Sequence, residues 1–356
     1  MKKLNLAIIG QGRSGRNIHG KYYKSEDNTL FNVKYVVEMD PARRTRAEEE
    51  YPGCVALEDY RQLFDKTDID LVVNASYSYM HYPITKDLLA HGFNVVVEKP
   101  FARNYFECAD LMNVAKEHGV MLAVFQQSFM APYYRKTLDV LKSGIIGDIL
   151  QVSVRFNGFA RRWDWQTLQD CLGGGVYNTG PHPIGIALGL MDFAEDARVV
   201  YSKLGLGLTS GDANDYAKII LAAKGHPVVD VEISSMDAFS NYNVKLQGTR
   251  GTYRTSTTSY SMKYMVDGEN PERPVIRESL QDEEGLPIYC RETPVIHTEE
   301  GKHDGDAFNT AVKDFYQMVY DYITEGKPLE LDPVDMAKIV SVMEEVHAAN
   351  PLPKKY

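Results

Sequence analysis

Cysteine, long apolar runs and an excess of positive charge are all missing or scarce in this chain of 356 residues. Its four cysteines, Cys54, Cys108, Cys171 and Cys290, form no CxxC pair, which argues against a zinc site or a disulfide framework and fits a reducing cytoplasm. No stretch approaches the roughly 20 apolar residues of a membrane helix, and the first residues read as a strand rather than a signal peptide. A net charge of −10 gives no support for binding nucleic acid or an anionic membrane. We therefore expect a soluble, cytoplasmic, metal-free protein.

The first 125 residues alternate between apolar runs and helix-like stretches. The runs lie at residues 4–9, 33–37, 69–74, 94–97 and 120–125, and the helical stretches at residues 15–24, 41–51, 82–91 and 105–118. Near-continuous Val/Ile/Leu strands separated by helices are typical of a parallel sheet covered on both faces. The pattern predicts a doubly wound α/β domain over residues 1–125.

The character changes in residues 126–356, which we assign to a second domain. A helix at 133–143 and a strand at 149–156 precede several short β segments between 199 and 266, and successive strands without helices between them predict an antiparallel sheet. Residues 267–306 read as loops with room for one strand. Helical periodicity returns at 307–324 and 333–349, and these helices are placed to pack back on the first domain.

A glycine-rich turn follows the first strand directly, in the segment Gly10-Gln11-Gly12-Arg13-Ser14-Gly15. Glycines allow a tight turn and close approach of backbone N–H groups to a pyrophosphate, and the following helix N-terminus adds favourable partial charge. Glu38 ends the next strand, where a carboxylate accepts hydrogen bonds from the adenosine ribose and favours NAD over NADP. Arg43 and Arg44 keep NADP open, since either can reach a 2′-phosphate. The candidate dinucleotide ligands of this region are Gly10, Gly12, Arg13, Ser14, Gly15, Glu38 and Arg43.

A lysine stands at the end of a later strand, in Glu98-Lys99-Pro100. This is the sheet edge at which ligands bind in doubly wound folds. Proline pushes the residue before it toward extended geometry and allows a cis bond, and either effect fixes where the lysine points. The alternative is an ordinary solvated surface lysine.

A histidine follows a run of glycines in the segment from Gly173 to Pro183. Asn178 and His182 are four residues apart and share a face if the segment is helical. Spacing alone leaves His182 open as either a functional residue or a buried structural histidine.

These segments together resemble the glucose–fructose oxidoreductase / inositol dehydrogenase family, often written Gfo/Idh/MocA. The resemblance covers essentially the whole chain: the glycine turn followed by His19, Asn74-Ala75-Ser76 with His81 downstream, Glu98-Lys99-Pro100, and the glycine-rich segment ending in His182. It implies a Rossmann domain joined to an α+β domain with a large, mostly antiparallel, open-faced sheet. It also implies NAD(P)-dependent oxidation or reduction of a sugar or cyclitol hydroxyl, and a partner subunit over the open sheet, in a dimer, tetramer or larger homo-oligomer. Lys99 is then a catalytic lysine and His182 the proton-transferring histidine. Further cofactor contacts are assigned to Ser76, His81, Glu98, Lys99 and Gln127.

The chain departs from the family pattern at three places. Asn178 stands where the family usually has aspartate, Gly185 replaces an acidic residue, and the family's Asn-x-Arg-Phe stretch reads Gln127-Ser128-Phe129-Met130. Losing the aspartate removes a carboxylate that would stabilise a protonated His182, so we expect this imidazole to lose its proton more easily than in relatives. The amide of Asn178 can still bind a substrate hydroxyl or select a histidine tautomer.

Both tryptophans fall within residues 159–166, the best candidate for sugar recognition. Aromatic faces pack on the C–H face of a pyranose, and charged side chains bind its hydroxyls. The alternative is a Trp-anchored loop at a domain or subunit boundary. The candidate substrate contacts are Lys99, Arg161, Arg162, Trp163, Asp164, Trp165, Asn178 and His182, with Tyr77 and Tyr79 as further pocket residues.

We therefore interpret the chain as an enzyme that catalyses reversible hydride transfer between NAD and a sugar-like secondary alcohol. The alcohol can also be the C3 hydroxyl of a glycoside. Three alternatives stay open: a glycoside 3-dehydrogenase that leaves cleavage to another protein, an NAD-dependent glycosidase acting through transient C3 oxidation, and a non-catalytic NAD-binding sensor. The substrate, the carbon oxidised and the physiological direction are left open by the sequence.

Overall fold

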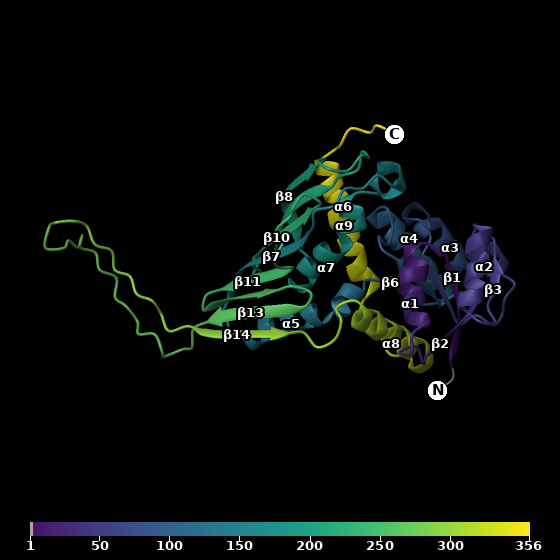
Figure 1. Ribbon diagram of the computed structural model, residues 1–356, viewed down its shortest axis with the longest axis horizontal. Helices are drawn as coiled ribbons and strands as arrows, with labels where there is room; N and C mark the ends of the chain where they lie inside the picture. Colours follow the sequence, from purple (N-terminus) through teal and green to yellow (C-terminus); the bar gives the residue numbers. More distant parts are fainter. Residues whose placement is uncertain (1–2) are drawn as a thin grey trace.

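Two sheets, bridged by helices, make up the computed structural model, which describes residues 3–356 (Figure 1). The first sheet is parallel and has six strands in the order β3-β2-β1-β4-β5-β6. Its strands are β1 (Leu4–Ile9), β2 (Phe31–Val37), β3 (Val55–Leu57), β4 (Leu71–Asn74), β5 (Val95–Glu98) and β6 (Leu122–Phe125). The order reverses between β1 and β4, so the crevice where a doubly wound fold binds its ligand opens at the end of β1.

Helices follow the strands of the first sheet as the sequence predicts, with one correction. The helices α2 (Pro41–Glu50), α3 (His81–Ala90) and α4 (Tyr105–His118) lie close to their predicted ranges. The single helix predicted over residues 15–24 is instead a π-helical segment, η1 (Arg13–His19), that passes into the short α1 (Gly20–Tyr23). We attribute the difference to the wider winding around Gly15, where an added Cβ would collide with the carbonyl oxygen of Gly10. In residues 3–356, no helix is both long and apolar enough to span a bilayer.

The second sheet has eight strands in the order β14-β13-β12-β11-β7-β10-β9-β8. Only the central β7–β10 pair is parallel; every other neighbour is antiparallel. Its strands are β7 (Ile149–Asn157), β8 (Arg198–Gly205), β9 (Tyr216–Ala222), β10 (Val228–Ser234), β11 (Val244–Gly248), β12 (Gly251–Thr255), β13 (Ser259–Tyr264) and β14 (His297–Lys302). The fold class predicted from the sequence is therefore confirmed.

One face of this second sheet is buried and the other is not. In β9 burial alternates strictly, with Ala217, Ile219 and Leu221 turned inward, as expected for a sheet packed on one side. The helices on the inner side are α5 (Pro132–Ser143), α6 (Gly175–Asn178), α7 (Pro181–Gly189) and α9 (Pro333–Ala349). Figure 1 shows them on the side of the sheet that faces the first domain, so no layer from residues 3–356 covers the outer face.

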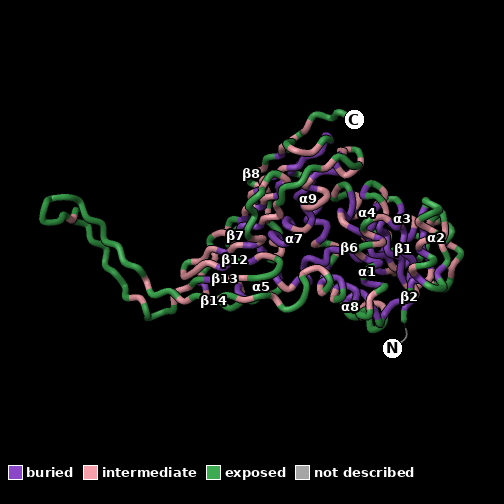
Figure 2. Tube along the Cα trace, viewed as in Figure 1, coloured by how far each residue is buried: buried purple, intermediate pink, exposed green. Residues whose placement is uncertain are grey.

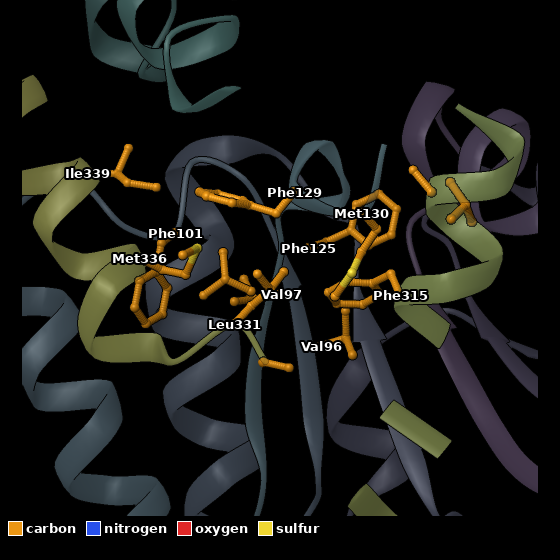
Figure 3. Packing of buried hydrophobic residues seen from close by; sticks show 14 of the residues in the cluster. Val96, Val97, Phe101, Phe125, Phe129, Met130, Phe315, Leu331, Met336 and Ile339 are labelled. Carbon is orange, nitrogen blue, oxygen red and sulfur yellow. The ribbon is translucent and has the colours of Figure 1, made fainter. Parts of the chain in front are cut away.

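The two halves share an apolar core at the carboxyl ends of strands β5 and β6 (Figure 3). Strands β5 and β6 meet there with the short turn η4 (Gln127–Met130) and with α8 (Asn309–Glu325) and α9. The apolar side chains in this region include Val96, Val97, Phe101, Phe125, Phe129, Met130, Phe315, Leu331, Met336 and Ile339. Helices from the end of the chain thus fix the edge of the first sheet on which Lys99 stands.

Candidate active site

The glycine turn is shaped to admit a phosphate group. Gly10 has a φ of +91°, and an added Cβ there would lie 2.5 Å from the carbonyl oxygen of Ala75. At Gly12, by contrast, an added Cβ would meet no atom within 4 Å, so this side of the turn is open. A closed turn beside an open backbone position is what a pyrophosphate cradle requires.

Glu38 closes the same turn from the end of β2. Its carboxylate is buried and accepts hydrogen bonds from the backbone N–H of Gln11 at 2.8 Å and of Asp40 at 3.0 Å. Each carboxylate oxygen has a second lone pair, so hydroxyl donors can still bind. Arg43 lies 3.7 Å from the Glu38 carboxylate, and Arg44 donates to the carbonyls of Glu38 and Met39 at 2.7 and 2.8 Å. Both arginines are thus engaged with the protein itself.

Glu98 is a buried carboxylate at the end of β5. It binds Nε2 of His19 at 3.1 Å and accepts the backbone N–H of Lys99 at 3.0 Å. Burial alone would raise the pKa of Glu98, but the hydrogen bond and charge of His19, with the nearby Lys99 and His81, lower it to about 2. Nδ1 of His19 reaches the hydroxyl of Tyr316 on α8 at 2.6 Å. The buried carboxylate of Glu98 is therefore fixed beside the backbone of Lys99.

Lys99 points across the interface between the two halves. The Lys99–Pro100 peptide bond is cis, and the lysine Nζ donates to the carbonyl oxygen of Asn178 at 2.7 Å. Burial lowers the pKa of Lys99; Glu98 opposes this, and the charges of Arg13 and Arg162 lower it further. Arg13 comes from the glycine turn and Arg162 from the second half, so Lys99 lies between the predicted cofactor and substrate residues.

Asn178 and His182 do not share one helix, contrary to the expectation from their spacing. α6 ends at Asn178, and α7 begins at Pro181, with Thr179 and Gly180 between them. Proline lacks a backbone N–H and suits the first turn of a helix, so the segment restarts there instead of continuing. The backbone carbonyl of Asn178, not its side chain, contacts Lys99. α6 is itself anchored through Tyr177, whose hydroxyl donates to the Arg103 carbonyl at 3.0 Å.

His182 is held by a residue of η4, the turn that directly follows the last strand of the Rossmann sheet, and the sequence alone did not single out this residue. The Nδ1 of His182 lies 3.2 Å from Oγ of Ser128, and Phe156 stacks near the ring at 6.2 Å. Burial lowers the pKa of His182 to about 3; Lys99 adds to this and Glu98 opposes it. In the sequence, the one indication that Ser128 belongs to the site is its place in the stretch Gln127–Met130, which departs from the family pattern.

Two neighbouring glutamines complete this part of the site. Gln126 was not among the site residues predicted from the sequence either. Its side chain donates to the carbonyl of Pro181 and so ties η4 to the start of α7. Gln127 is buried, and its Oε1 has no hydrogen-bond partner within residues 3–356. It is thus an acceptor for which a bound group can supply the donor.

Ser76 and His81 join the ends of β4 and β5. Ser76 Oγ donates to the side chain of Asn74 at 2.7 Å, and the ring nitrogens of His81 face the carbonyls of Pro100 at 2.8 Å and Ser76 at 3.2 Å. Burial lowers the pKa of His81. With both ring nitrogens already facing protein carbonyls, His81 holds the loops that carry Ser76 and Lys99.

An aromatic cluster spans the two halves beside these residues. Trp165 meets the ring of Tyr77 edge-on at 5.0 Å, and Tyr77 stacks on Tyr79 at 5.6 Å. Arg162 forms a two-pronged pair with Asp164 at 2.9 to 3.0 Å and also contacts Gln166. Trp163 and Arg161 are exposed, and Trp163 is 77 % exposed. The predicted loop thus divides into an inner part, Arg162 and Trp165, and an outer part. No group of three or more His, Cys, Asp or Glu residues in the described range could hold a metal ion.

Comparison with known proteins bears on the family, the fold and the cofactor. A family model described as "Oxidoreductase family, NAD-binding Rossmann fold" matches residues 4–126, and one described as "GFO/IDH/MocA C-terminal domain" matches residues 134–254. The chain is 25 % identical to a 2,7-anhydro-N-acetylneuraminate hydratase of Mediterraneibacter gnavus, over 81 % of this chain and 77 % of that protein. It is 21 % identical to the scyllo-inositol 2-dehydrogenase (NADP(+)) IolW of Bacillus subtilis, over 96 % and 92 % of the two chains.

Among solved structures, the fold matches KijD10, a 3-ketoreductase from Actinomadura kijaniata solved with NADP and TDP-benzene. The TM-score is 0.79, with 18 % identity over 98 % of both chains. The family predicted from the sequence and the dinucleotide cofactor are confirmed. The chain belongs to the Gfo/Idh/MocA family of NAD(P)-binding oxidoreductases, and residues 4–126 form its NAD-binding Rossmann domain.

Proposed function

We propose that this protein is an NAD-dependent dehydrogenase that transfers a hydride between nicotinamide and a secondary alcohol of a sugar, cyclitol or glycoside. One observation carries the proposal: Lys99, at the ligand-binding edge of the Rossmann sheet, donates to the carbonyl of Asn178, four residues before His182, and its charge acts on His182. When bound, NAD supplies the hydride acceptor, while the protein supplies position and electrostatics.

His182 takes the hydroxyl proton. With a pKa of about 3 it is neutral at physiological pH and so always available as a base. For Nε2 to accept the proton, the ring hydrogen must sit on Nδ1 and be donated to Oγ of Ser128. The imidazole is a weak base in the empty site, but negative charge developing on the substrate oxygen favours its protonated form as the reaction proceeds.

Lys99 supplies positive charge to the substrate oxygen from which the proton leaves. Its anchor on the Asn178 carbonyl fixes the ammonium group, so little reorganisation is needed as charge develops. The buried Glu98 behind it favours the charged form of the lysine and limits the fall in its pKa.

The cofactor preference that we infer is NAD over NADP. The buried Glu38 carboxylate stands where the adenosine ribose is bound in Rossmann domains and would repel a 2′-phosphate. Arg44 is committed to two backbone carbonyls, and Arg43 pairs with Glu38 and Asp40.

The inner part of the 159–166 loop is the proposed sugar contact. Trp165 and the adjacent Tyr77 supply aromatic surface for the C–H face of a sugar ring, and Arg162, which is held in place by the exposed Asp164, supplies donors for its hydroxyls.

A second candidate is elimination or hydration through transient oxidation, as in an NAD-dependent glycosidase. The relative from Mediterraneibacter gnavus favours it, because that protein is named a hydratase within an oxidoreductase family. Release of an aglycone without net NADH would support this candidate over simple oxidation.

The test is a screen of NAD reduction against free sugars, cyclitols, sugar acids and aryl glycosides, followed by two variants. We expect Lys99→Ala and His182→Ala each to lower turnover of the best substrate by about 100-fold or more, since positioned charge and general base catalysis contribute on that scale. Binding of NADH, followed by its fluorescence, should stay nearly unchanged. Matched controls are Lys116→Ala and His118→Ala on the exposed side of α4. Normal turnover in the Lys99/His182 double variant would refute this mechanism.

A further inference from the structure

The last residues of the chain lie against the loop that carries the proposed sugar contacts. We call residues 350–356, which follow the end of α9, the strap, and residues 159–173 the sugar loop. The strap runs past the end of α9 near β8 (Figure 1), and Figure 2 shows it exposed along most of its length. The two family-model matches end at residues 126 and 254, so neither includes the strap.

A buried carboxylate, that of Asp212, joins the strap to the sugar loop. Asp212 is 1 % exposed, and its two carboxylate oxygens accept the backbone N–H of Lys355 at 2.9 Å and that of Gln169 at 3.0 Å. Burial would raise the pKa of Asp212, but hydrogen bonds from the backbone N–H groups of Lys355, Gln169 and Tyr356 lower it. A buried charge is costly without such donors, so the conformation of Asp212 depends on the strap and on the sugar loop together.

The strap also contacts the sugar loop directly. The side chain of Gln169 donates to the carbonyl of Pro353 at 3.3 Å, and Lys354 pairs with Asp170 at 2.5 Å. Both members of this ion pair are more than half exposed, so the pair contributes little by itself. The buried carboxylate of Asp212 is therefore the principal link between the two segments.

The segment that carries this carboxylate is bonded to the part of the sugar loop that holds the proposed sugar contacts. The backbone N–H of Ser210 donates to the carbonyl of Arg162 at 3.0 Å, and that of Ala213 donates to the carbonyl of Thr167 at 3.0 Å. Trp165 lies in the sequence between these two bonded positions. A displacement of the segment is therefore passed to both Arg162 and Trp165.

A cavity lies between the strap and the end of the sugar loop. Its volume is about 410 Å³, and its walls include Asp170, Leu172 and Gly173 of the sugar loop and Pro351 and Leu352 of the strap. Close packing, which fixes side chains in a protein core, is therefore absent on this side of the loop. The position of the loop depends instead on the hydrogen bonds that the strap and Asp212 make.

We propose that the strap is a positioning element for the sugar loop and that Asp212 is the positioning residue through which it acts. While Asp212 holds the two segments together, Arg162 and Trp165 are already ordered when the sugar arrives, which favours binding. Release of the strap lets the loop move and weakens sugar binding, whereas the glycine turn and Glu38 at the cofactor end are not touched. The effect on turnover rests on the proposed function, but the effect on the position of the loop does not.

The first experiment follows the sugar loop without any substrate. The chain has two tryptophans, so Trp163→Phe leaves Trp165 as the only one, and quenching of its fluorescence by acrylamide reports how exposed it is. Lys355→Pro removes the backbone N–H that Asp212 accepts, whereas Lys355→Ala keeps it. In this background we expect Lys355→Pro and Asp212→Asn each to raise the quenching constant by about twofold, and Lys355→Ala to leave it unchanged. Lys355 is exposed near the end of the chain, so its substitution leaves the core intact and decides the matter if Asp212→Asn does not fold.

The second experiment compares kinetic constants for the best substrate found in the NAD screen. Lys355→Pro and Asp212→Asn should each raise KM by about fivefold to tenfold and leave kcat within about twofold of the parent, because the substrate must then order the loop as it binds. Asp139→Asn on the exposed side of α5 is the matched carboxyl-to-amide control and should change neither constant. Binding of NADH shows that each variant is folded.

Raised quenching together with raised KM supports the proposal. Quenching that is unchanged in both Lys355→Pro and Asp212→Asn overturns it, and so does an unchanged KM in an active enzyme. A parent chain that oxidises none of the compounds refutes the proposed function instead, and the fluorescence of Trp165 then decides the role of the strap by itself.

Discussion

Replacing Glu98 by glutamine isolates the contribution of the buried anion behind Lys99. The amide keeps the shape of the side chain but removes its charge, as protonation would. A carboxyl pKa lowered from 4.5 to about 2 corresponds to about 3 kcal/mol of stability near neutral pH. Because the pKa is depressed in the folded state, this contribution is complete above about pH 5 and is lost as the pH falls through 2. We therefore expect Glu98→Gln to lower the free energy of unfolding by about 3 kcal/mol near pH 7 but by only about 1 kcal/mol near pH 3.

The assay is urea unfolding followed by circular dichroism at both pH values. Glu117→Gln on the exposed face of α4 is the matched carboxyl-to-amide control and should change stability by less than about 0.5 kcal/mol. A Glu98→Gln variant as stable as the parent near pH 7, or one whose deficit is the same at both pH values, would show that His19 and Lys99 do not stabilise this carboxylate as the geometry indicates.

Three further predictions concern the site. Ser128→Ala should lower turnover by about five- to tenfold, because it removes the hydrogen bond that selects the His182 tautomer. Ser128→Thr keeps the hydroxyl and should retain most of the turnover. An equal loss of turnover in both variants, each of them folded, would mean that Ser128 acts through packing alone. Glu38→Ser should raise the ratio of kcat/KM for NADP to that for NAD, measured with one substrate, and an unchanged ratio would refute its role in cofactor choice. Gly174→Ala should lower the free energy of unfolding by about 1–3 kcal/mol. Gly174 has a φ of +93°, and an added Cβ would lie 2.6 Å from the Asn214 side chain. A variant that unfolds in urea at the same midpoint as the parent would contradict this prediction.

The parts of the site that the sequence predicts well are local ones. The glycine turn, Glu38 and Lys99 each lie at the end of an apolar strand, so short-range pattern and the rule for parallel sheets place them at one edge. The aromatic loop is also local, but only the structure separates Trp165, which meets Tyr77, from the exposed Trp163.

The parts that the sequence did not reveal depend on contacts between distant residues. Ser128 meets His182 across 54 positions, and Tyr316 meets His19 across 297. No periodicity encodes such pairs. The break between α6 and α7 is different, because Pro181 after a glycine is a local signal for a new helix that the four-residue spacing of Asn178 and His182 concealed.

The contact between Tyr316 and His19 also sets an order of events during synthesis. The strands of the Rossmann sheet are complete once residue 125 has been made, yet the tyrosine that covers His19 follows about 190 residues later. At translation rates of about 5–20 residues per second, this delay is about 10–40 s. Throughout that interval the nascent domain presents the aromatic surface of Tyr22, Phe31 and Phe125 without the helix that buries it. The last helices of the chain therefore end a period in which the new protein is open to chaperones and to aggregation.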